Sequence, residues 1–504
     1  MRWIHPLAPE AAAPADVIGG KAHGLVVLRR LGLPVPAGFV IGTEACRAFL
    51  RDGRLPDGLD DELAAAVADL EGATGRKLGG PRRPLAVSVR SGARESMPGM
   101  MTTVLNLGLT AAATAWLAAE TGDAGFAHDS RLRFLSSFAA ATASDDATEH
   151  LKLAVAAVFD SWETPRARTY RAIHGIAHDL GTAVIVQAMV YGNRDHRSGT
   201  GVAFSRNPNT GERAPFGEVL FGHQGEDVVS GRSLTRPLSD LADREPEVWA
   251  GLRAALSRVE EHYRDACYLE FTFEAGDLWL LQVRPGRFVG TAAVRVATEL
   301  ADEGAIGRHE ALLRVSPQQL RQARTRRIAA GDGADLFARG LGACPGAAVG
   351  RVATTADKAA RMAADGPVIL VRPETSPLDL HGIAAAAGVV TARGGPASHA
   401  AVVARAMGKP AVVGIANLAV ADASVRAGGR TIPEGTLIAI DGTSGEVVLG
   451  SPRLTTSDAD PHLNRLLTWA DEVSGDASAR TEAERLSAAH TALTRGSALQ
   501  RHRD

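Results

Sequence analysis

The stretch TARGGPASHAAVVARAMGKPAVVG, residues 391–414, decides how this 504-residue chain is interpreted. Its two glycines, Gly394 and Gly395, let the backbone turn tightly and approach a ligand. Ser398 is a favourable N-cap residue, so we expect a helix to begin at about His399. The N-terminus of a helix presents free N–H groups and the positive end of its dipole, which suits a phosphoryl group.

A histidine at this place has two interpretations. It can be a nucleophile that carries a phosphoryl group covalently, with Arg393 and Arg405 as candidate charge partners. A lone histidine after glycines is, however, more often a surface residue at the start of a helix. The choice between the two therefore depends on the rest of the chain.

Composition excludes several classes of protein. The chain has 55 Lys and Arg against 57 Asp and Glu, a formal charge of −2, so no basic field indicates a nucleic-acid partner. The three cysteines are far apart and form no CxxC pair, so the sequence indicates neither a zinc knuckle nor a disulfide framework. The first residues lack the apolar core of a signal peptide, and no apolar run reaches membrane-spanning length. We expect a cytoplasmic protein with no membrane and no nucleic-acid partner.

The order of strand and helix patterns predicts a multidomain chain of the α/β and α+β classes. Residues 1–305 form the first predicted domain, which is mostly helical at about 111–180. Residues 306–340 are predicted to be a helical, polar and basic linker. A compact α/β domain follows at 341–450 and contains His399, and 451–504 is predicted to be a helical tail.

The predicted first domain lacks both a GxxxxGK[ST] loop and a GxGxxG fingerprint, so any nucleotide site must be of another type. Lys21 lies in IGGKAHG, a glycine loop that opens a helix, where a lysine can reach a phosphate. Arg90 ends a predicted buried strand, Leu85 to Arg90, where a charged side chain needs a partner or a ligand.

A second set of polar residues lies on a predicted hairpin, YLEFTFEAGDLWLLQVRPG, with its turn across Gly276–Asp277. Alternation along the two strands places Glu270, Gln282 and Arg284 near one another on one face. Oxygen atoms of Glu270 and Gln282 are suitable ligands for Mg²⁺, and arginine binds polyphosphate. Each residue alone is explained equally well by a structural ion pair, but the set together favours a nucleotide site.

At this point the chain resembles the pyruvate phosphate dikinase family and, more broadly, the enzymes that use phosphoenolpyruvate. The resemblance rests on ordered motifs from about residue 16 to about residue 472. These motifs include SVRSGARESMPGMMTTVLNLGL, SGTGVAFSRNPNTGE, GEDVVSG, LEFTFE, LLQVRPG and GGPASHAAVVARAMGKPAVVG.

The resemblance implies an ATP-grasp-type nucleotide-binding domain followed by a swivelling β/β/α phosphohistidine domain. It implies that Lys21, Arg90, Glu270, Gln282 and Arg284 bind ATP and Mg²⁺, with Arg90 and Arg284 acting in catalysis. It further implies that His399 is phosphorylated. In the family the histidine takes the β-phosphoryl group of ATP and the γ-phosphoryl group passes to inorganic phosphate, which gives AMP and pyrophosphate.

Three departures from the family pattern qualify this expectation. The C-terminal barrel that binds pyruvate or phosphoenolpyruvate is absent from the sequence, so the acceptor is expected on a separate protein. Ala397 replaces a threonine that is a regulatory site in the plant enzymes. Thr102, in PGMMTT, stands where the family usually has an aspartate, which bears on how phosphate is handled.

Two alternatives stay open. The chain could transfer the phosphoryl group to a different small molecule, as relatives that phosphorylate an antibiotic do. It could also be a non-catalytic regulatory protein that senses ATP. Phosphorylation of His399 separates both enzyme hypotheses from the regulatory one.

Overall fold

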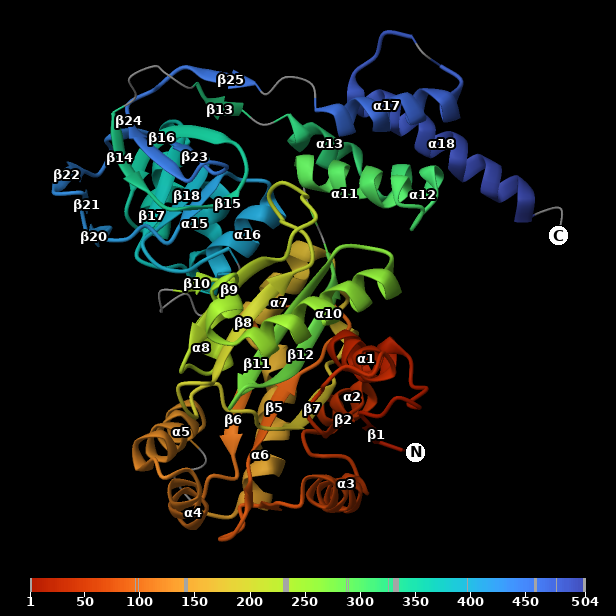
Figure 1. Ribbon diagram of the computed structural model, residues 1–504, viewed down its shortest axis with the longest axis vertical. Coiled ribbons are helices and arrows are strands. Elements are labelled where there is room, and N and C mark those ends of the chain that lie inside the picture. The colour runs from red at the N-terminus through yellow and green to blue at the C-terminus, as the bar shows by residue number, and fades with distance from the viewer. Residues whose placement is uncertain are drawn as a thin grey trace. The chain divides into compact units, whose positions relative to one another are not determined.

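The structure is a computed structural model, shown in Figure 1. It describes residues 2–95, 97, 99–139, 144–229, 235–286, 288, 290–324, 326–329, 335–396, 398–456, 460–476 and 478–501. Ala397 therefore lies outside the described residues. The chain divides into two compact units. The first contains residues 1–200, 221–224 and 269–284, and the second contains residues 201–220, 225–268 and 285–504.

The first unit combines a sheet with helices that cover it. Its helices are α1 (Ala15–Arg30), α2 (Thr43–Asp52), α3 (Leu59–Thr74), α4 (Ala111–Thr121), α5 (Ala124–Ser137), α6 (Ala147–Asp160) and α7 (Pro165–His174), with 3₁₀ turns at Ser161–Glu163 and His178–Leu180. Its strands are β1 (Ile4–Pro6), β2 (Gly38–Ile41), β3 (Lys77–Leu78), β4 (Pro84–Leu85), β5 (Val87–Ser91), β6 (Thr103–Leu107) and β7 (Val184–Ala188). Helices α4 to α7 occupy most of the region at about 111–180 that the sequence predicts to be helical.

The main sheet of this unit has the strand order β1-β2-β7-β5-β6. Its central strands are apolar, because Val87, Val89, Val184 and Val186 join one core cluster with residues of α2, α3 and α6. Strands β5 and β7 are antiparallel and place Arg90 opposite Ile185. Side chains of Thr110, Asp123 and Asp146 accept hydrogen bonds from the first turns of α4, α5 and α6, which explains where these helices begin.

A second five-stranded sheet has the order β10-β9-β8-β11-β12. Its strands are β8 (Gly199–Phe204), β9 (Phe216–Phe221), β10 (Arg236–Pro237), β11 (Cys267–Glu274) and β12 (Asp277–Pro285). The predicted hairpin is present, but its turn lies at Ala275 (φ 52°) and Gly276 (φ 91°), one residue before the predicted Gly276–Asp277. Two residues with positive φ are typical of the tight turn that matches strand twist. The hairpin residues 269–284 belong to the first unit.

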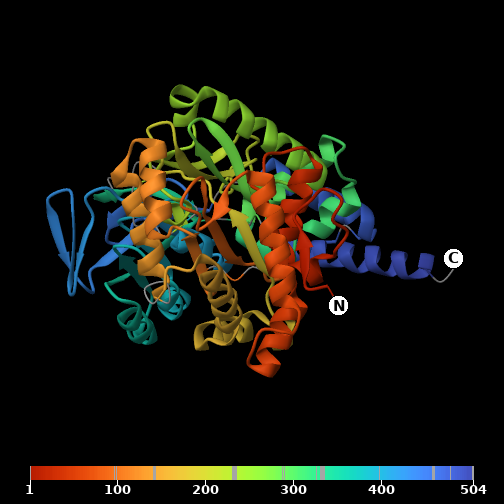
Figure 2. The same cartoon turned by 90° about the horizontal axis from the view of Figure 1, so that it is seen from below.

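The second unit contains the remaining helices and an eight-stranded sheet. Its helices are α8 (Gly225–Val229), α9 (Asp240–Arg244), α10 (Pro246–Tyr263), α11 (Gly290–Asp302), α12 (Arg308–Arg314), α13 (Pro317–Ala323), α14 (Ala356–Met362), α15 (Leu380–Ala385), α16 (His399–Met407), α17 (Pro461–Ser474) and α18 (Glu482–Arg501), with 3₁₀ turns at Ala363–Asp365 and Pro377–Asp379. Helix α18 is the last element that the structure describes, and it lies next to the C label in Figure 1 and in Figure 2, where it is blue.

The eight-stranded sheet has the order β14-β24-β23-β16-β17-β18-β19-β15. Its strands, and the further strands nearby, are β13 (Arg326–Ile328), β14 (Leu336–Arg339), β15 (Leu341–Cys344), β16 (Ala347–Ala353), β17 (Val368–Arg372), β18 (Gly388–Thr391), β19 (Ala411–Val413), β20 (Ala419–Ala421), β21 (Ser424–Ala427), β22 (Arg430–Pro433), β23 (Leu437–Asp441), β24 (Glu446–Leu449) and β25 (Leu454–Thr456). Strands and helices alternate from β16 to β19, as in an α/β domain, and β20 to β22 form a separate three-stranded sheet.

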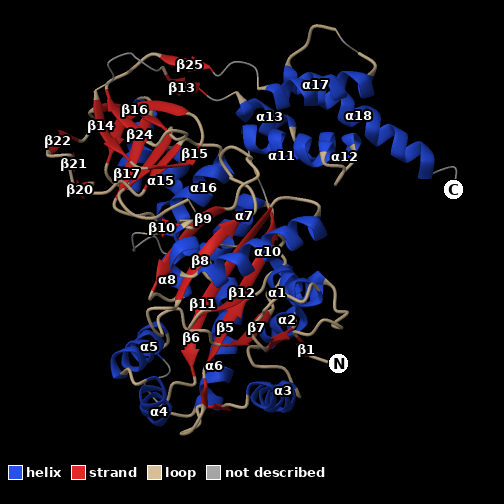
Figure 3. Ribbon diagram, in the orientation of Figure 1, coloured by secondary structure: helices blue, strands red, loops and turns tan. Residues whose placement is uncertain are grey.

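Both faces of this sheet are apolar, because alternate residues of its strands enter different core clusters. Val368 and Leu370 of β17 pack with α14, α15 and α16, whereas Ile369 and Val371 pack with residues of β21 to β23. The helices that carry and surround His399 therefore lie on one face of the sheet (Figure 3).

The segment 306–340 is not helical throughout, so that prediction was wrong in its second half. Helix α12 ends at Arg314 and α13 ends at Ala323, and both contribute to one apolar cluster with α11, α17 and α18. Beyond them, β13 pairs with β25 and β14 pairs with β24. The basic residues of this segment favour a solvated helix when they are considered alone. The strands that pair with β13 and β14 lie more than a hundred residues away in the sequence, so no local pattern indicates that these segments are strands.

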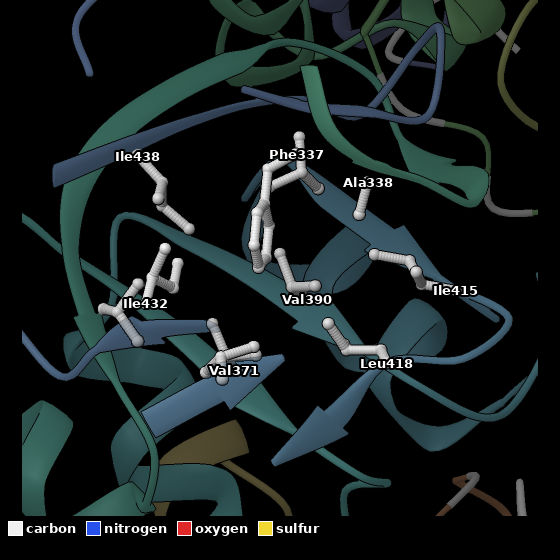
Figure 4. A pocket seen from close by; sticks show the side chains of 11 residues that line it. Phe337, Ala338, Val371, Val390, Ile415, Leu418, Ile432 and Ile438 are labelled. Atoms are coloured by element: carbon white, nitrogen blue, oxygen red, sulfur yellow. The ribbon is translucent and has the colours of Figure 1, made fainter. Parts of the chain in front are cut away.

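Two hollows lie apart from the predicted site residues. Figure 4 shows a small void under the eight-stranded sheet, lined by apolar side chains such as Phe337, Val390 and Ile438. A wider groove in the first unit lies beside α3, β1 and β2. Neither contains a predicted site residue. Among the helices that the structure describes, none is long and apolar enough to cross a bilayer.

Candidate functional site

Lys21 lies just after a break in α1. Gly19 has φ 78° and ψ 157°, so the helix is interrupted there and resumes before Lys21. A Cβ atom at Gly19 would lie 1.4 Å from the carbonyl oxygen of Gly92, and the N–H of Gly20 donates to Ala93 at 3.2 Å. The two glycines thus hold the start of this helix against the loop that follows β5, and Lys21 is in its first turn.

Arg90 is the second-last residue of β5, and a side chain that sequence reasoning missed holds it in place. Its Nη2 donates to Oε1 of Gln187 at 2.6 Å, and Nε2 of Gln187 donates to the carbonyl of Pro36 at 2.9 Å. Gln187 is 1% exposed, on β7. Nε of Arg90 is buried and has no hydrogen-bond partner among the described residues. A buried donor of this kind is expected to find its partner in a ligand.

The hairpin β11–β12 supplies the other predicted residues of this site. Glu270 lies on β11, and Gln282 and Arg284 lie on β12. With the amide of Gln282 oriented so that its oxygen faces Arg284, this oxygen accepts from Nε and Nη2 of the guanidinium. Gln282 is almost fully buried, so its amide fixes the direction in which Arg284 extends.

Electrostatics couple these residues into one site. Burial lowers the pKa of Lys21 to about 8, while Glu270 acts to raise it and Arg284 and Arg90 act to lower it. Burial also lowers the pKa of Arg90, and Glu270 opposes this. The site therefore holds three cationic side chains and one carboxylate, an excess of positive charge that favours a polyanion.

The residues present fit a magnesium–polyphosphate ligand. Among the described residues no three His, Cys, Asp or Glu side chains gather as a metal site. Mg²⁺ is commonly held by one or two protein oxygens together with phosphates and water. Glu270 and Gln282 supply such oxygens, and the unpartnered Nε of Arg90 supplies a donor for phosphate. Binding of Mg²⁺ by Gln282 would require its oxygen to exchange Arg284 for the ion.

His399 lies in the second unit and is the first residue of α16, so this helix begins where the sequence predicts. Its Nδ1 lies 3.1 Å from Oγ1 of Thr375, a buried residue between β17 and α15. Nε2 has no hydrogen-bond partner among the described residues. If Nδ1 keeps the proton and donates it to Thr375, then Nε2 carries the lone pair. Burial lowers the pKa of His399, and the nearby Asp379 acts to raise it, so the neutral ring is favoured.

The two arginines considered as charge partners of His399 have other partners in the structure. Arg405 is buried and donates to the backbone carbonyls of Ala343 and Pro396. Arg393 is half-exposed and pairs with Glu374 at 2.8 Å. Arg405 therefore fixes the loop before His399, because it binds Pro396 within that loop.

The structure thus brings Lys21, Arg90, Glu270, Gln282 and Arg284 together in the first unit and places His399 in the second. Sequence reasoning missed Gln187, Thr375 and Asp379. Gln187 carried the same signal as Arg90, namely a polar side chain in an apolar strand. Thr375 and Asp379 lie in a polar turn, where their residue types indicate capping before any catalytic role. Thr102 donates its N–H to Oγ of Ser161 at 3.1 Å.

Comparisons with known proteins agree with this arrangement. The model of the pyruvate phosphate dikinase AMP/ATP-binding domain matches residues 15–71 and 50–237. The model of the mobile domain of PEP-utilising enzymes matches residues 364–445, which include His399. The matched regions therefore cover parts of both units.

Similarity to individual proteins extends across most of this chain. Pyruvate, phosphate dikinase 2 of Oryza sativa subsp. japonica is 41% identical over 91% of this chain and 58% of its own length. Pyruvate, phosphate dikinase of Rhizobium meliloti is 38% identical over 96% of this chain and 62% of its own length. The corresponding protein of Clostridium symbiosum is 37% identical over 94% and 60%. The chain thus spans about three fifths of the length of these relatives, and it belongs to the pyruvate phosphate dikinase family of PEP-utilising enzymes.

Proposed function

We propose that the chain is an ATP-dependent phosphotransferase in which His399 accepts a phosphoryl group from ATP. The observation that carries this proposal is the state of His399, whose Nδ1 is engaged by Thr375 while Nε2 has no partner among the described residues. A neutral imidazole with one nitrogen engaged and the other open is suited to nucleophilic attack. Family membership supports the same conclusion.

The first unit, in this proposal, is an ATP-grasp-type domain that binds ATP with Lys21, Arg90, Glu270, Gln282 and Arg284. Lys21, Arg90 and Arg284 neutralise the phosphates, and the two arginines stabilise the charge that develops during transfer. Glu270 and Gln282 would hold Mg²⁺, which when bound neutralises phosphate charge. Gln187 and the glycines before Lys21 position these side chains.

The chemical step uses the lone pair of Nε2. A bond forms between Nε2 and the β-phosphorus of ATP, and the bond from that phosphorus to the bridging oxygen of AMP breaks, so AMP leaves with the electron pair. An oxygen of inorganic phosphate then bonds to the γ-phosphorus and gives pyrophosphate. The bond from the γ-phosphorus to the oxygen that bridges it to the β-phosphorus breaks, and that oxygen stays on the β-phosphoryl group that His399 carries. Nδ1 keeps its proton throughout and donates it to Thr375, which stabilises the positive charge that forms on the ring.

The domain at about 341–450, together with β14 of the same sheet, would then swivel about the part of the segment 306–340 that precedes β14 and deliver the phosphoryl group. The acceptor is pyruvate, bound by a separate protein or by sequence beyond residues 1–504. Magnesium ATP, inorganic phosphate and the pyruvate–phosphoenolpyruvate pair are therefore the expected ligands of the complete reaction. The names of the relatives support this choice of acceptor over another small molecule.

An exchange reaction tests the proposed half-reaction without any acceptor. The protein is incubated with Mg²⁺, ATP, inorganic phosphate, pyrophosphate and labelled AMP, and label is followed into ATP. We expect exchange in the native chain and none in His399→Ala, which should still bind ATP. Exchange that persists in His399→Ala would contradict the proposal. ATP binding without any exchange or labelling would favour the regulatory alternative.

A further inference from the structure

The loop before His399 contains a buried hydroxyl group that the structure leaves unused. Ser398 is 3% exposed, and its Oγ has no hydrogen-bond partner among the described residues. A buried polar atom without a partner lowers the stability of the folded state. Such an atom calls for an explanation, and a ligand that arrives later in the reaction is one.

Ser398 has the backbone of an N-cap residue but does not act as one through its side chain. Its φ of −61° and ψ of 161° are those of a cap, yet no N–H of α16 donates to its Oγ. Other caps of the same unit do form this bond. Oγ1 of Thr355 accepts from Lys358 at 3.2 Å, and Oγ of Ser376 accepts from Leu378 at 3.2 Å.

The backbone N–H groups in the first turn of α16 also lack acceptors among the described residues. The first backbone bond of this helix runs from the N–H of Val402 to the carbonyl of Ser398 at 3.0 Å. Among the described residues, no acceptor engages the N–H groups of His399, Ala400 or Ala401. Three helix donors and one buried hydroxyl group therefore belong to the four residues from Ser398 to Ala401, at the positive end of the helix dipole.

The loop is also held rigidly in this form. Arg405 donates to Pro396, two residues before Ser398, and to Ala343 at 2.9 Å. The N–H of Ser398 donates to the carbonyl of Gly395 at 3.0 Å. Hydrogen bonds from its N–H and to its carbonyl fix the backbone of Ser398. The Cβ atom that carries the hydroxyl group is therefore in position before a ligand binds, so binding requires little reorganisation of the backbone.

We propose that Ser398 is a phosphoryl-binding residue whose hydroxyl group donates to a phosphoryl oxygen once His399 is modified. A phosphoryl group on Nε2 brings three oxygen acceptors and two negative charges beside these donors. The hydroxyl of Ser398 would stabilise the phosphorylated form and leave the unmodified form with an unpaired group. This inference rests on the proposed phosphorylation of His399.

The test compares Ser398→Ala with Ser376→Ala, a cap whose side chain does bond in the same unit. Each protein is phosphorylated with phosphoramidate, a small phosphoryl donor that needs no ATP site. The decay of phosphohistidine at neutral pH and the melting temperature of the unmodified protein are then measured.

For Ser398→Ala we expect phosphohistidine to decay about tenfold to a hundredfold faster than in the native chain. The melting temperature of its unmodified form should be equal to or above that of the native protein, because the variant removes an unpaired hydroxyl group. Ser376→Ala should melt at a lower temperature and keep the native decay rate. Ser398→Cys, with a weak donor, should decay at an intermediate rate.

Native decay in Ser398→Ala would overturn the inference. A melting temperature lowered as in Ser376→Ala would overturn it as well, since it would show that the hydroxyl group is a structural cap. Failure of the proposed function has a different signature. In that case the native chain would take label from phosphoramidate but none from ATP, and the comparison of decay rates would still decide the role of Ser398.

Discussion

Nδ1 of His399 lies 3.1 Å from the hydroxyl oxygen of Thr375, which is buried and comes from a different segment of the second unit. This pair fixes the orientation of the ring and favours the tautomer in which Nε2 has the lone pair. Thr375 is therefore a positioning residue, which acts on the reaction through His399.

Thr375→Val should reduce the rate of His399 labelling by ATP roughly tenfold to a hundredfold, because the ring loses the acceptor for its Nδ1 proton. Valine has nearly the same shape, so folding should be retained. Thr375→Ser restores the hydroxyl group and should recover most of the rate. Equal labelling rates in Thr375→Val and the native chain would remove Thr375 from the mechanism.

The labelling rate should depend on pH through His399. Burial lowers the pKa of this histidine below its usual value, so Nε2 stays unprotonated at pH 6.5 and labelling should fall only at lower pH. The same shift should lower the free energy of unfolding as the pH falls below the ordinary histidine pKa of 6.5, because the unfolded chain then binds the proton more readily than the folded chain.

Asp379 opposes that shift, and Asp379→Asn should move the acid limb of the labelling profile to still lower pH. The control is Asp357→Asn, which removes a carboxylate that contacts His381 at 2.9 Å in the same unit. Its profile should match that of the native chain. An acid limb that stays in place in Asp379→Asn would show that this carboxylate does not influence His399.

Lys21→Met should weaken ATP binding and stabilise the ATP-free protein at pH 7. The pKa of Lys21 falls to about 8 in the folded chain, so holding its charge there costs stability, on the order of 1–3 kcal/mol. Between about pH 8 and the ordinary lysine pKa of 10.5, the unfolded chain binds more protons, so the native protein should gain stability as pH rises.

Urea unfolding at pH 7 and at pH 10, together with calorimetric titration of ATP, checks both parts. The rise in stability with pH should be smaller in Lys21→Met than in the native chain. The native affinity for ATP should itself decline above about pH 8, as Lys21 loses its charge. A variant that binds ATP as tightly as the native chain would exclude Lys21 from the nucleotide site.

Gly19→Ala should disturb the nucleotide site, because the new Cβ would lie 1.4 Å from the carbonyl oxygen of Gly92 and the position has φ 78°. The matched control is Gly32→Ala, since Gly32 has φ 67° and a Cβ atom added there would have nothing within 4 Å. The control should lose about 1 kcal/mol from backbone strain. Gly19→Ala should lose more and should also bind ATP less well. Equal losses in both variants would show that the contact with Gly92 is unimportant.

Local patterns predicted a large part of the fold and of the site. The hairpin around Gly276 follows from turn chemistry and strand alternation, and the start of α16 at His399 follows from the residues around Ser398. Arg90 was predicted as a site residue because a charged group in an apolar strand needs a partner. All of these signals lie within about ten residues of the feature that they predict.

Features that depend on distant pairing could not be predicted in this way. Strand β13 pairs with residues Leu454–Thr456, and the basic sequence that forms it indicates a helix when considered alone. Arg405 was expected to contact phosphate, but it binds the carbonyls of Ala343 and Pro396, and no sequence pattern shows where these carbonyls point. Thr375 approaches His399 only through the tertiary fold.

The most direct test of the account is labelling with ATP that carries the label in its β-phosphoryl group. The protein is incubated with Mg²⁺ and this ATP, with and without inorganic phosphate, and the labelled peptide is mapped. We predict acid-labile, base-stable label on His399, formed together with AMP and absent from His399→Ala. No label in a protein that binds ATP, or label on any residue other than His399, would contradict the proposal that ATP phosphorylates His399.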